Sequence, residues 1–163
     1  MPNPDHFDGD VRVRRHGDAD RSVPPLRGVT PGQAATLGAV VDTIVPADGY
    51  PSGTEAGVLD YLAGQFGRDL ADLRAYYGAG LDAVDAEARE RHGAGFPELP
   101  PGRREELLRA LEAGDTRVPW PFDAAAFVET VVGHVMEGFY GDPDNGGNHD
   151  AVSWRMIGFE VRD

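Results

Sequence analysis

The spacing of the apolar residues constrains the fold of this chain more than any other feature of its sequence. Leu37, Val40, Val41 and Ile44 recur three and four positions apart, which is the period of one face of an α-helix. The same period returns in four later segments, and no alternating pattern typical of a strand runs for a convincing length. The sequence therefore predicts an all-α domain of five helices, over about 30–44, 52–67, 69–91, 103–112 and 124–140.

Several helix ends carry capping signals. Thr30 and Gln33 form the pattern of a capping box, with a proline between them at the first helical position. Ser52 and Glu55 repeat the pattern, and Asp123 is placed to cap the last helix. These signals predict where the first, second and fifth helices begin.

Two glycines, Gly78 and Gly80, interrupt the third predicted helix. Each costs roughly 1 kcal/mol relative to alanine inside a helix, so a sequence that keeps both has a structural reason for them. We expect that the helix bends at this point or that another backbone packs closely against it.

Charge and composition exclude several classes of function. The 163 residues include 28 acidic and 15 basic side chains, for a formal net charge of −13, so nucleic acid and anionic membrane surfaces are not expected partners. The chain has no cysteine, which excludes disulfides, thiolate metal sites and thiol nucleophiles. No run approaches the roughly 18 to 20 apolar residues that a membrane span needs, so we expect no direct membrane insertion.

The first 29 residues differ from the rest. They contain five aspartates, five arginines and two consecutive prolines without any helical or strand period. We interpret residues 1–29 as an extended or disordered N-terminal arm and residues 30–163 as the helical domain. Arg12, Arg14 and Arg15 form the basic cluster of this arm, and we expect them to contact acidic groups on a partner.

The segment from Gly138 to Phe159 combines Gly, Asn and Asp, which adopt turn conformations readily, with large aromatic residues. This composition predicts an ordered C-terminal loop. In one interpretation the loop covers the core, with Trp154, Met156, Ile157 and Phe159 as plugs. In another it presents aromatic anchors to a partner, because buried aromatic side chains often dominate binding energy.

Three chemical alternatives involve the same segment. Asp142, Asp144, Gly146, Asn148 and Asp150 place oxygens at every second position, as in a calcium loop, but Gly146 stands where the EF-hand pattern needs Asp or Asn, and Ser153 where it needs a bidentate Glu. A transition-metal site could use His134, Glu137 and His149. A free-standing acid–base enzyme could use Asp142, His149 and Asp150, although no nucleophile elbow, phosphate loop or dinucleotide fingerprint accompanies them.

Two separated motifs carry a family resemblance. The first reads L-G-A-V-V-D-T-I-V-P-A-D over 37–48 and is followed by E-A-G-V over 55–58. The second starts as G-F-Y-G-D-P at 138–143, passes through G-G-N at 146–148 and ends as W-R-M-I-G at 154–158. In order and spacing the chain resembles the gluconate 2-dehydrogenase subunit 3 family.

This resemblance implies a small, non-catalytic helical subunit. Its expected partner is a large FAD-binding oxidoreductase of the glucose–methanol–choline family that oxidises a sugar, sugar acid or glycoside. It implies no cofactor in this chain, FAD in the partner, and a role in folding, flavin loading or export of that partner. Whether a cytochrome joins the complex stays open.

We combine the resemblance with the loop composition to select candidate interface residues. They are Phe139, Tyr140, Asp142, Asn145, Asn148, His149, Trp154 and Met156 in the loop, with Arg14 and Arg15 in the arm. Members of the family often carry a twin-arginine signal, but no apolar segment follows Arg14 and Arg15. We therefore expect a cytoplasmic protein, or a periplasmic one if a partner's signal exports the complex.

Overall fold

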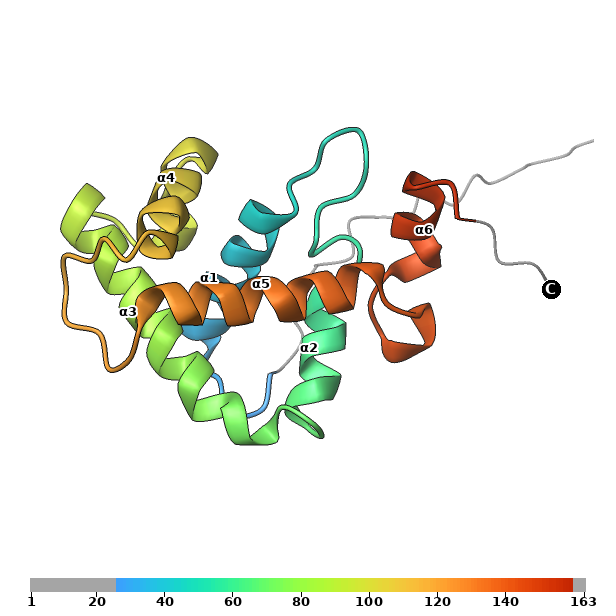
Figure 1. Ribbon diagram of the computed structural model, residues 1–163, viewed down its shortest axis with the longest axis horizontal. Helices are drawn as coiled ribbons and strands as arrows, with labels where there is room; N and C mark the ends of the chain where they lie inside the picture. Colours follow the sequence, from blue (N-terminus) through green and yellow to red (C-terminus); the bar gives the residue numbers. More distant parts are fainter. Residues whose placement is uncertain (1–25, 160–163) are drawn as a thin grey trace, which may run out of the picture.

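A long helix, α5 (Ala124–Tyr140), runs along the molecule, and the other helices pack beside it (Figure 1). The computed structural model describes residues 26–159, which contain six α-helices and no strand. The prediction of an all-α fold is confirmed. The remaining helices are α1 (Pro31–Ile44), α2 (Val58–Phe66), α3 (Arg74–His92), α4 (Pro101–Glu112) and the short α6 (Val152–Met156).

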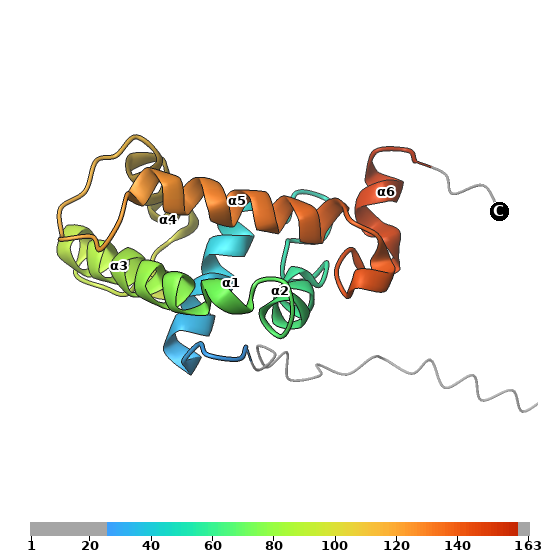
Figure 2. The same cartoon turned by 60° about the horizontal axis from the view of Figure 1, so that its bottom comes forward.

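The helices form two layers. In Figure 2, α5 lies on one side, and α3, α1 and α2 follow one another on the other side. Helices α2 and α4 make the most extensive contacts with α5, while α1 packs against α3. None of the helices in the described part of the chain is both long and apolar enough to cross a membrane.

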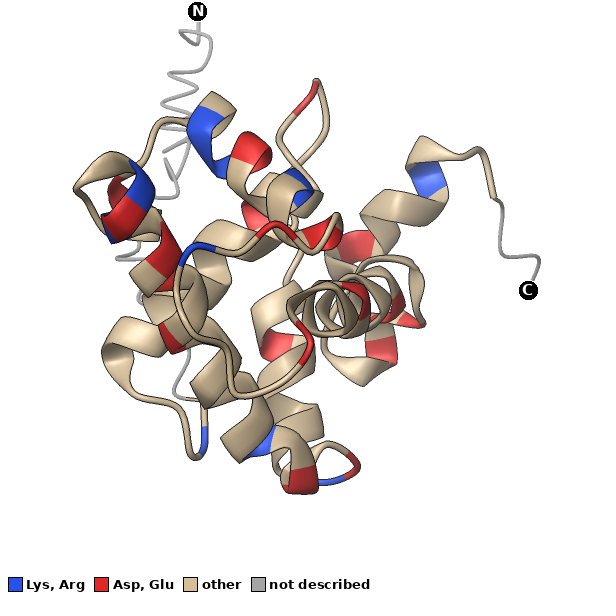
Figure 3. Ribbon diagram, turned by 60° about the vertical axis from the view of Figure 1, so that its left-hand side comes forward, with Lys and Arg blue, Asp and Glu red and all other residues tan. Residues whose placement is uncertain are grey.

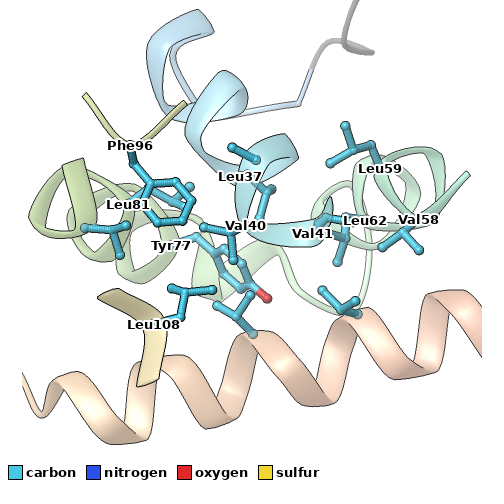
Figure 4. Packing of buried hydrophobic residues seen from close by; sticks show 14 of the residues in the cluster. Leu37, Val40, Val41, Val58, Leu59, Leu62, Tyr77, Leu81, Phe96 and Leu108 are labelled. Carbon is cyan, nitrogen blue, oxygen red and sulfur yellow. The ribbon is translucent and has the colours of Figure 1, made fainter. Parts of the chain in front are cut away.

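The core lies between these layers and uses the apolar faces that the sequence predicts. Leu37 and Val41 of α1 are fully buried, and so are Leu62 of α2 and Leu81 of α3 (Figure 4). The hydroxyl of buried Tyr77 points out of this cluster toward α5 (Figure 4). Helix α1 is thus enclosed by its neighbours, which explains why its whole middle is apolar.

The capping signals are confirmed at two helix starts and misplaced at a third. Thr30 and Gln33 form the reciprocal capping box of α1, and Asp123 accepts a hydrogen bond from a backbone N–H of α5. The Ser52 N–H donates to Glu55, as in a capping box, but this pair closes a turn that precedes α2. Helix α2 begins only at Val58, because Gly57 in a left-handed conformation separates the turn from the helix.

The third helix begins later than the sequence predicts. Residues 71–73 form a single 3₁₀ turn, and α3 starts at Arg74. The carbonyl of Gln65 accepts hydrogen bonds from the N–H groups of Arg68 and Leu70, which holds the chain in a tight turn here. These hydrogen bonds fold the end of α2 into a turn, although the apolar residues keep their helical spacing through it.

The close approach expected at the glycines of α3 is made by a side chain and not by a backbone. A Cβ on Gly80 would lie 2.2 Å from the ring of Phe127 of α5. Gly78 offers its carbonyl to the side-chain amide of Gln33, 3.2 Å away. Gly80 therefore sets how closely α3 and α5 approach.

A buried carboxylate ties α3 to the connection between α4 and α5. Glu87 is fully buried and receives hydrogen bonds from Arg91, from the backbone N–H groups of residues 117 and 118, and from the indole of Trp120. Burial alone would raise the pKa of Glu87, but these donors together lower the pKa below its usual value. The connection is thus fixed by one ionised side chain.

Candidate functional site

The loop after α5 is built around one buried asparagine. Asn148 is fully buried, and its amide Nδ2 donates to the carbonyl of Gly141 at 2.9 Å. Its Oδ1 accepts from both the backbone N–H and the hydroxyl of Ser153, at 2.9 and 2.7 Å. Asn148 therefore joins the end of α5 to the start of α6.

The backbone of this loop adopts a left-handed conformation at three residues that are not glycine. The φ angles of Asn148, Asp150 and Ala151 are 45°, 56° and 52°. Such conformations are costly, above all for alanine, and persist only where the surroundings impose them. The hydrogen bonds of Asn148 supply that constraint, so the loop has a fixed shape.

His149 fastens the loop to the start of α2. Its backbone N–H donates to the carbonyl of Ala56 at 2.8 Å, and its Nε2 lies 3.0 Å from the carbonyl of Gly146 and 3.2 Å from a carboxylate oxygen of Asp60. Both neighbours of Nε2 are acceptors, so this nitrogen carries the proton. The ring covers Gly57, where a Cβ would lie 2.2 Å from Nε2.

This rigid loop presents an apolar surface that we call the C-terminal patch, made of Tyr140, Trp154, Met156, Ile157 and Phe159. Tyr140 is 41% exposed, Ile157 61% and Phe159 56%. The indole of half-buried Trp154 donates to the carbonyl of Tyr140 at 2.9 Å and packs edge-on against Phe159. The interpretation of Ile157 and Phe159 as core plugs is wrong, because both side chains point outward.

The other predicted interface residues differ in how much of their surface is exposed. Asp142, Asn145 and His149 are exposed and remain interface candidates. Phe139 and Asn148 are almost fully and fully buried within this chain, so they support the surface from below and cannot themselves contact a partner. Arg14 and Arg15 lie outside the described residues.

In the part of the chain that the structure describes, the residues considered above for a metal site do not come together as ligands. Within residues 26–159, no group of three or more His, Asp or Glu side chains is placed to hold a metal ion. His134 Nδ1 is 2.7 Å from the hydroxyl of Tyr77, and Glu137 accepts from Tyr61 at 3.1 Å. These ligand candidates are therefore satisfied by tyrosines.

Tyr61 donates to the carboxylate of Glu137, whereas the direction of the hydrogen bond between Tyr77 and His134 depends on the tautomer of the histidine. Burial, with the nearby charge of Glu137, strongly raises the pKa of Tyr77, and burial with the hydrogen bond to Glu137 raises the pKa of Tyr61. Both phenols stay protonated at neutral pH, and neither can act as a general base there. The acid–base candidates Asp142 and Asp150 are exposed, and Asp142 accepts from the N–H of Asp144 in a local turn.

The first motif, residues 37–48, holds a loop that adds a second apolar element to the surface beside the C-terminal patch. This element was not predicted from the sequence. Asp42 of α1 accepts from both the N–H and the hydroxyl of Thr54, at 2.9 and 2.8 Å, and holds the loop that connects α1 and α2. This loop exposes Tyr50 by 51% and forms a groove of about 390 Å³ with Met136, Tyr140 and Met156. The sequence feature that could have indicated this element is Tyr50, an aromatic residue between a glycine and a proline in a polar turn.

Comparison with known proteins gives one match. A family model described as gluconate 2-dehydrogenase subunit 3 matches residues 31–160, which is most of the chain. No curated protein and no solved structure matches the chain. The matched region contains both motifs, the Asn148 loop and nearly the whole described domain.

Proposed function

The chain belongs to the gluconate 2-dehydrogenase subunit 3 family, and from this we propose that it is the non-catalytic small subunit of an FAD-dependent sugar, sugar-acid or glycoside dehydrogenase. In this role it supports the folding, flavin loading and assembly of a large flavoprotein of the glucose–methanol–choline type. The observation that carries the proposal is the C-terminal patch, a set of exposed apolar side chains on a rigid loop. Exposed apolar surface of this kind is typical of a protein interface.

The structure of the patch suits an interface more than a substrate pocket. Its aromatic residues are fixed by hydrogen bonds and ring contacts within the chain, as the bond from Trp154 to Tyr140 illustrates. A surface that is ordered before binding loses little side-chain entropy on association. Such a surface can hold a large partner without supplying any reacting group.

We propose that the FAD is bound by the partner, as the family resemblance implies. In a Rossmann-type flavoprotein a strand, a glycine-rich turn and a helix follow one another and hold the dinucleotide, and this is the unit that we expect in the partner. The flavin supplies the oxidation of the sugar, and this chain acts on the protein that holds the flavin. The proposed compartment is the cytoplasm, or the periplasm if the flavoprotein carries the export signal.

Co-expression tests the proposal. The chain, a glucose–methanol–choline type flavoprotein from the same organism, and the co-expressed pair are each purified and compared for bound FAD and for dehydrogenase activity on gluconate, glucose and a glycoside. We expect a colourless, inactive lone chain, and a yellow complex with more FAD per flavoprotein than the flavoprotein made alone. Turnover by the lone chain, or equal flavin content with and without it, would refute the proposal.

A pair of variants connects this result to the patch. Ile157→Glu places a charge in the exposed patch, while Ala126→Glu adds the same charge at an exposed position of the first turn of α5. The first variant should lower the yield of complex strongly, and the second should not. Activity per bound flavin should be unchanged in both, because neither residue contacts the reacting groups in this proposal.

A further inference from the structure

Helix α5 carries a second apolar row besides the one in the core. Val131 and Val135 face the core and are fully buried or nearly so. Val128, Val132, Met136 and Tyr140 follow one another at intervals of four, which places them in one ridge along the helix. This ridge emerges from the core: Val128 is buried, Val132 and Met136 are half-buried, and Tyr140 is 41% exposed.

The ridge lines two neighbouring grooves that share part of their lining, and we call them together the α5 groove. Its first part, about 540 Å³, lies between Val128 and Val132 and the side of α4 that carries Leu108. Its second part, about 390 Å³, lies between Met136 and Tyr140 and the loop that carries Tyr50. Both parts share Ile44 and Pro46 as their opposite wall. From residue 128 to 140 the groove spans about 18 Å at the rise of an α-helix.

The rim of the groove is acidic. Asp48, Glu105 and Glu112 line it, and its one lining arginine, Arg109, is paired with Glu105 at 2.6 Å. Figure 3 shows the same predominance of acidic over basic positions across the described domain. A second copy of this chain would bring its own charge of −13 to an acidic groove, which opposes self-association. The complementary occupant is apolar along its centre and basic at its edges.

The walls favour a helix as the occupant. They consist mainly of the sides of α1, α4 and α5, whose backbone groups are already paired within each helix, so an extended segment would find no strand edge to pair with. About 18 Å corresponds to roughly 12 residues, or about three turns of a docked helix. The apolar ridge of such a helix can pack beside the ridge of α5, as in common helix pairs.

We propose that the α5 groove binds a basic amphipathic helix of the FAD-binding partner. The segment has apolar residues at helical spacing over about three turns and Lys or Arg on both flanks. This inference rests on the proposed function and names the part of the partner that the chain recognises. The groove continues into the C-terminal patch through Tyr140 and Met156, so one partner can cover both.

The test uses the complete chain and the complete co-expressed flavoprotein, with affinity measured by titration at two salt concentrations. The groove variant Asp48→Arg with Glu112→Arg reverses two rim charges, and the control Asp72→Arg with Glu90→Arg reverses two exposed charges away from the groove. We expect the groove variant to bind at least about tenfold more weakly and with less salt dependence than the control. The control should differ little from wild type.

A second variant examines the apolar ridge. Met136→Glu, compared with Ala126→Glu on the same helix, should reduce affinity about thirtyfold or more. Hydrogen exchange of wild type should show protection of residues 44–51 and 128–140 in the complex. This measurement needs no substitution, so a loss of stability in Met136→Glu does not weaken the test.

Four outcomes would overturn the inference. If wild type binds the flavoprotein but the groove variants bind like their controls and residues 128–140 gain no protection, the groove is not the docking site and the proposed function stands. If wild type does not bind the flavoprotein, the proposed function itself fails. Self-association that Met136→Glu abolishes would identify a second copy as the occupant. Loss of protection over 128–140 on deletion of residues 1–25 would identify the chain's own arm.

Discussion

Replacement of Asn148 by alanine tests whether the C-terminal loop is held by a single side chain. The change removes three hydrogen bonds and leaves the carbonyl of Gly141 and the N–H of Ser153 without their partner. A buried polar group left unpaired costs about 1 to 3 kcal/mol, and alanine tolerates the left-handed backbone less well than asparagine. We expect a loss of about 3 kcal/mol or more, which lowers the Tm of a domain of this size by roughly 10 °C.

Two further variants make this test specific. Asn145→Ala changes the same residue type at an exposed position of the same loop and should leave the Tm almost unchanged. Asn148→Asp keeps an acceptor for Ser153 but replaces the donor to Gly141 with an oxygen, so it should destabilise the chain at neutral pH. Acidification should return part of its stability, because a protonated carboxyl can donate again.

The assay combines thermal unfolding by circular dichroism with hydrogen exchange over residues 141–157. We expect Asn148→Ala to lose protection throughout this segment and to bind the flavoprotein weakly, because the C-terminal patch loses its support. A Tm within about 2 °C of wild type, with full protection, would refute the argument that Asn148 holds the loop.

Three further predictions follow from other contacts. Glu87→Gln should destabilise the chain by about 1 to 3 kcal/mol at neutral pH, because Arg91 loses the nearer of its two carboxylate partners and keeps Asp115 at 3.6 Å. Because the pKa of Glu87 is lowered, wild type should lose this advantage as pH falls below the usual value of 4.5, and denaturant unfolding at several pH values checks this. Trp154→Ala should lower the Tm by roughly 5 to 10 °C and the affinity for the flavoprotein about thirtyfold, as a melting curve and a titration can show. Deletion of residues 1–25, which leaves buried Leu26 in place, should lower the affinity for the flavoprotein by a small factor and reduce its dependence on salt. Unchanged salt dependence would contradict a role for Arg14 and Arg15.

Local signals in the sequence were sufficient to predict α1 to α5 and the starts of α1 and α5. Thr30 with Gln33 and Asp123 act through hydrogen bonds that span three residues, so no distant part of the chain is needed to interpret them. The same locality explains the error at Ser52 and Glu55. Their hydrogen bond forms as expected, but a single left-handed residue, Gly57, decides that a turn and not a helix follows.

The surface could be predicted only in part, because it depends on contacts that no periodic spacing in the sequence specifies. The composition of residues 138–159 indicated an ordered loop, but not which aromatic residues point outward. The partners of Asn148, Gly141 and Ser153, are only seven and five residues away, but no periodic pattern marks the left-handed loop that brings them together. The α5 groove requires Ile44 and Pro46 to lie opposite Val132, a pairing that no spacing in the sequence specifies.

The proposed role in flavin loading has a thermodynamic consequence. A subunit can raise the affinity of its partner for FAD only if it binds the loaded form more tightly than the empty form, and by linkage the two factors must be equal. The rigid loop around Asn148 is suited to this, since a surface of fixed shape can discriminate between two forms of a partner. We therefore expect the chain to bind the FAD-loaded flavoprotein several-fold to about a hundredfold more tightly than the empty one, as titration of each form can measure. Equal affinities would show that the chain assists folding without favouring the loaded state.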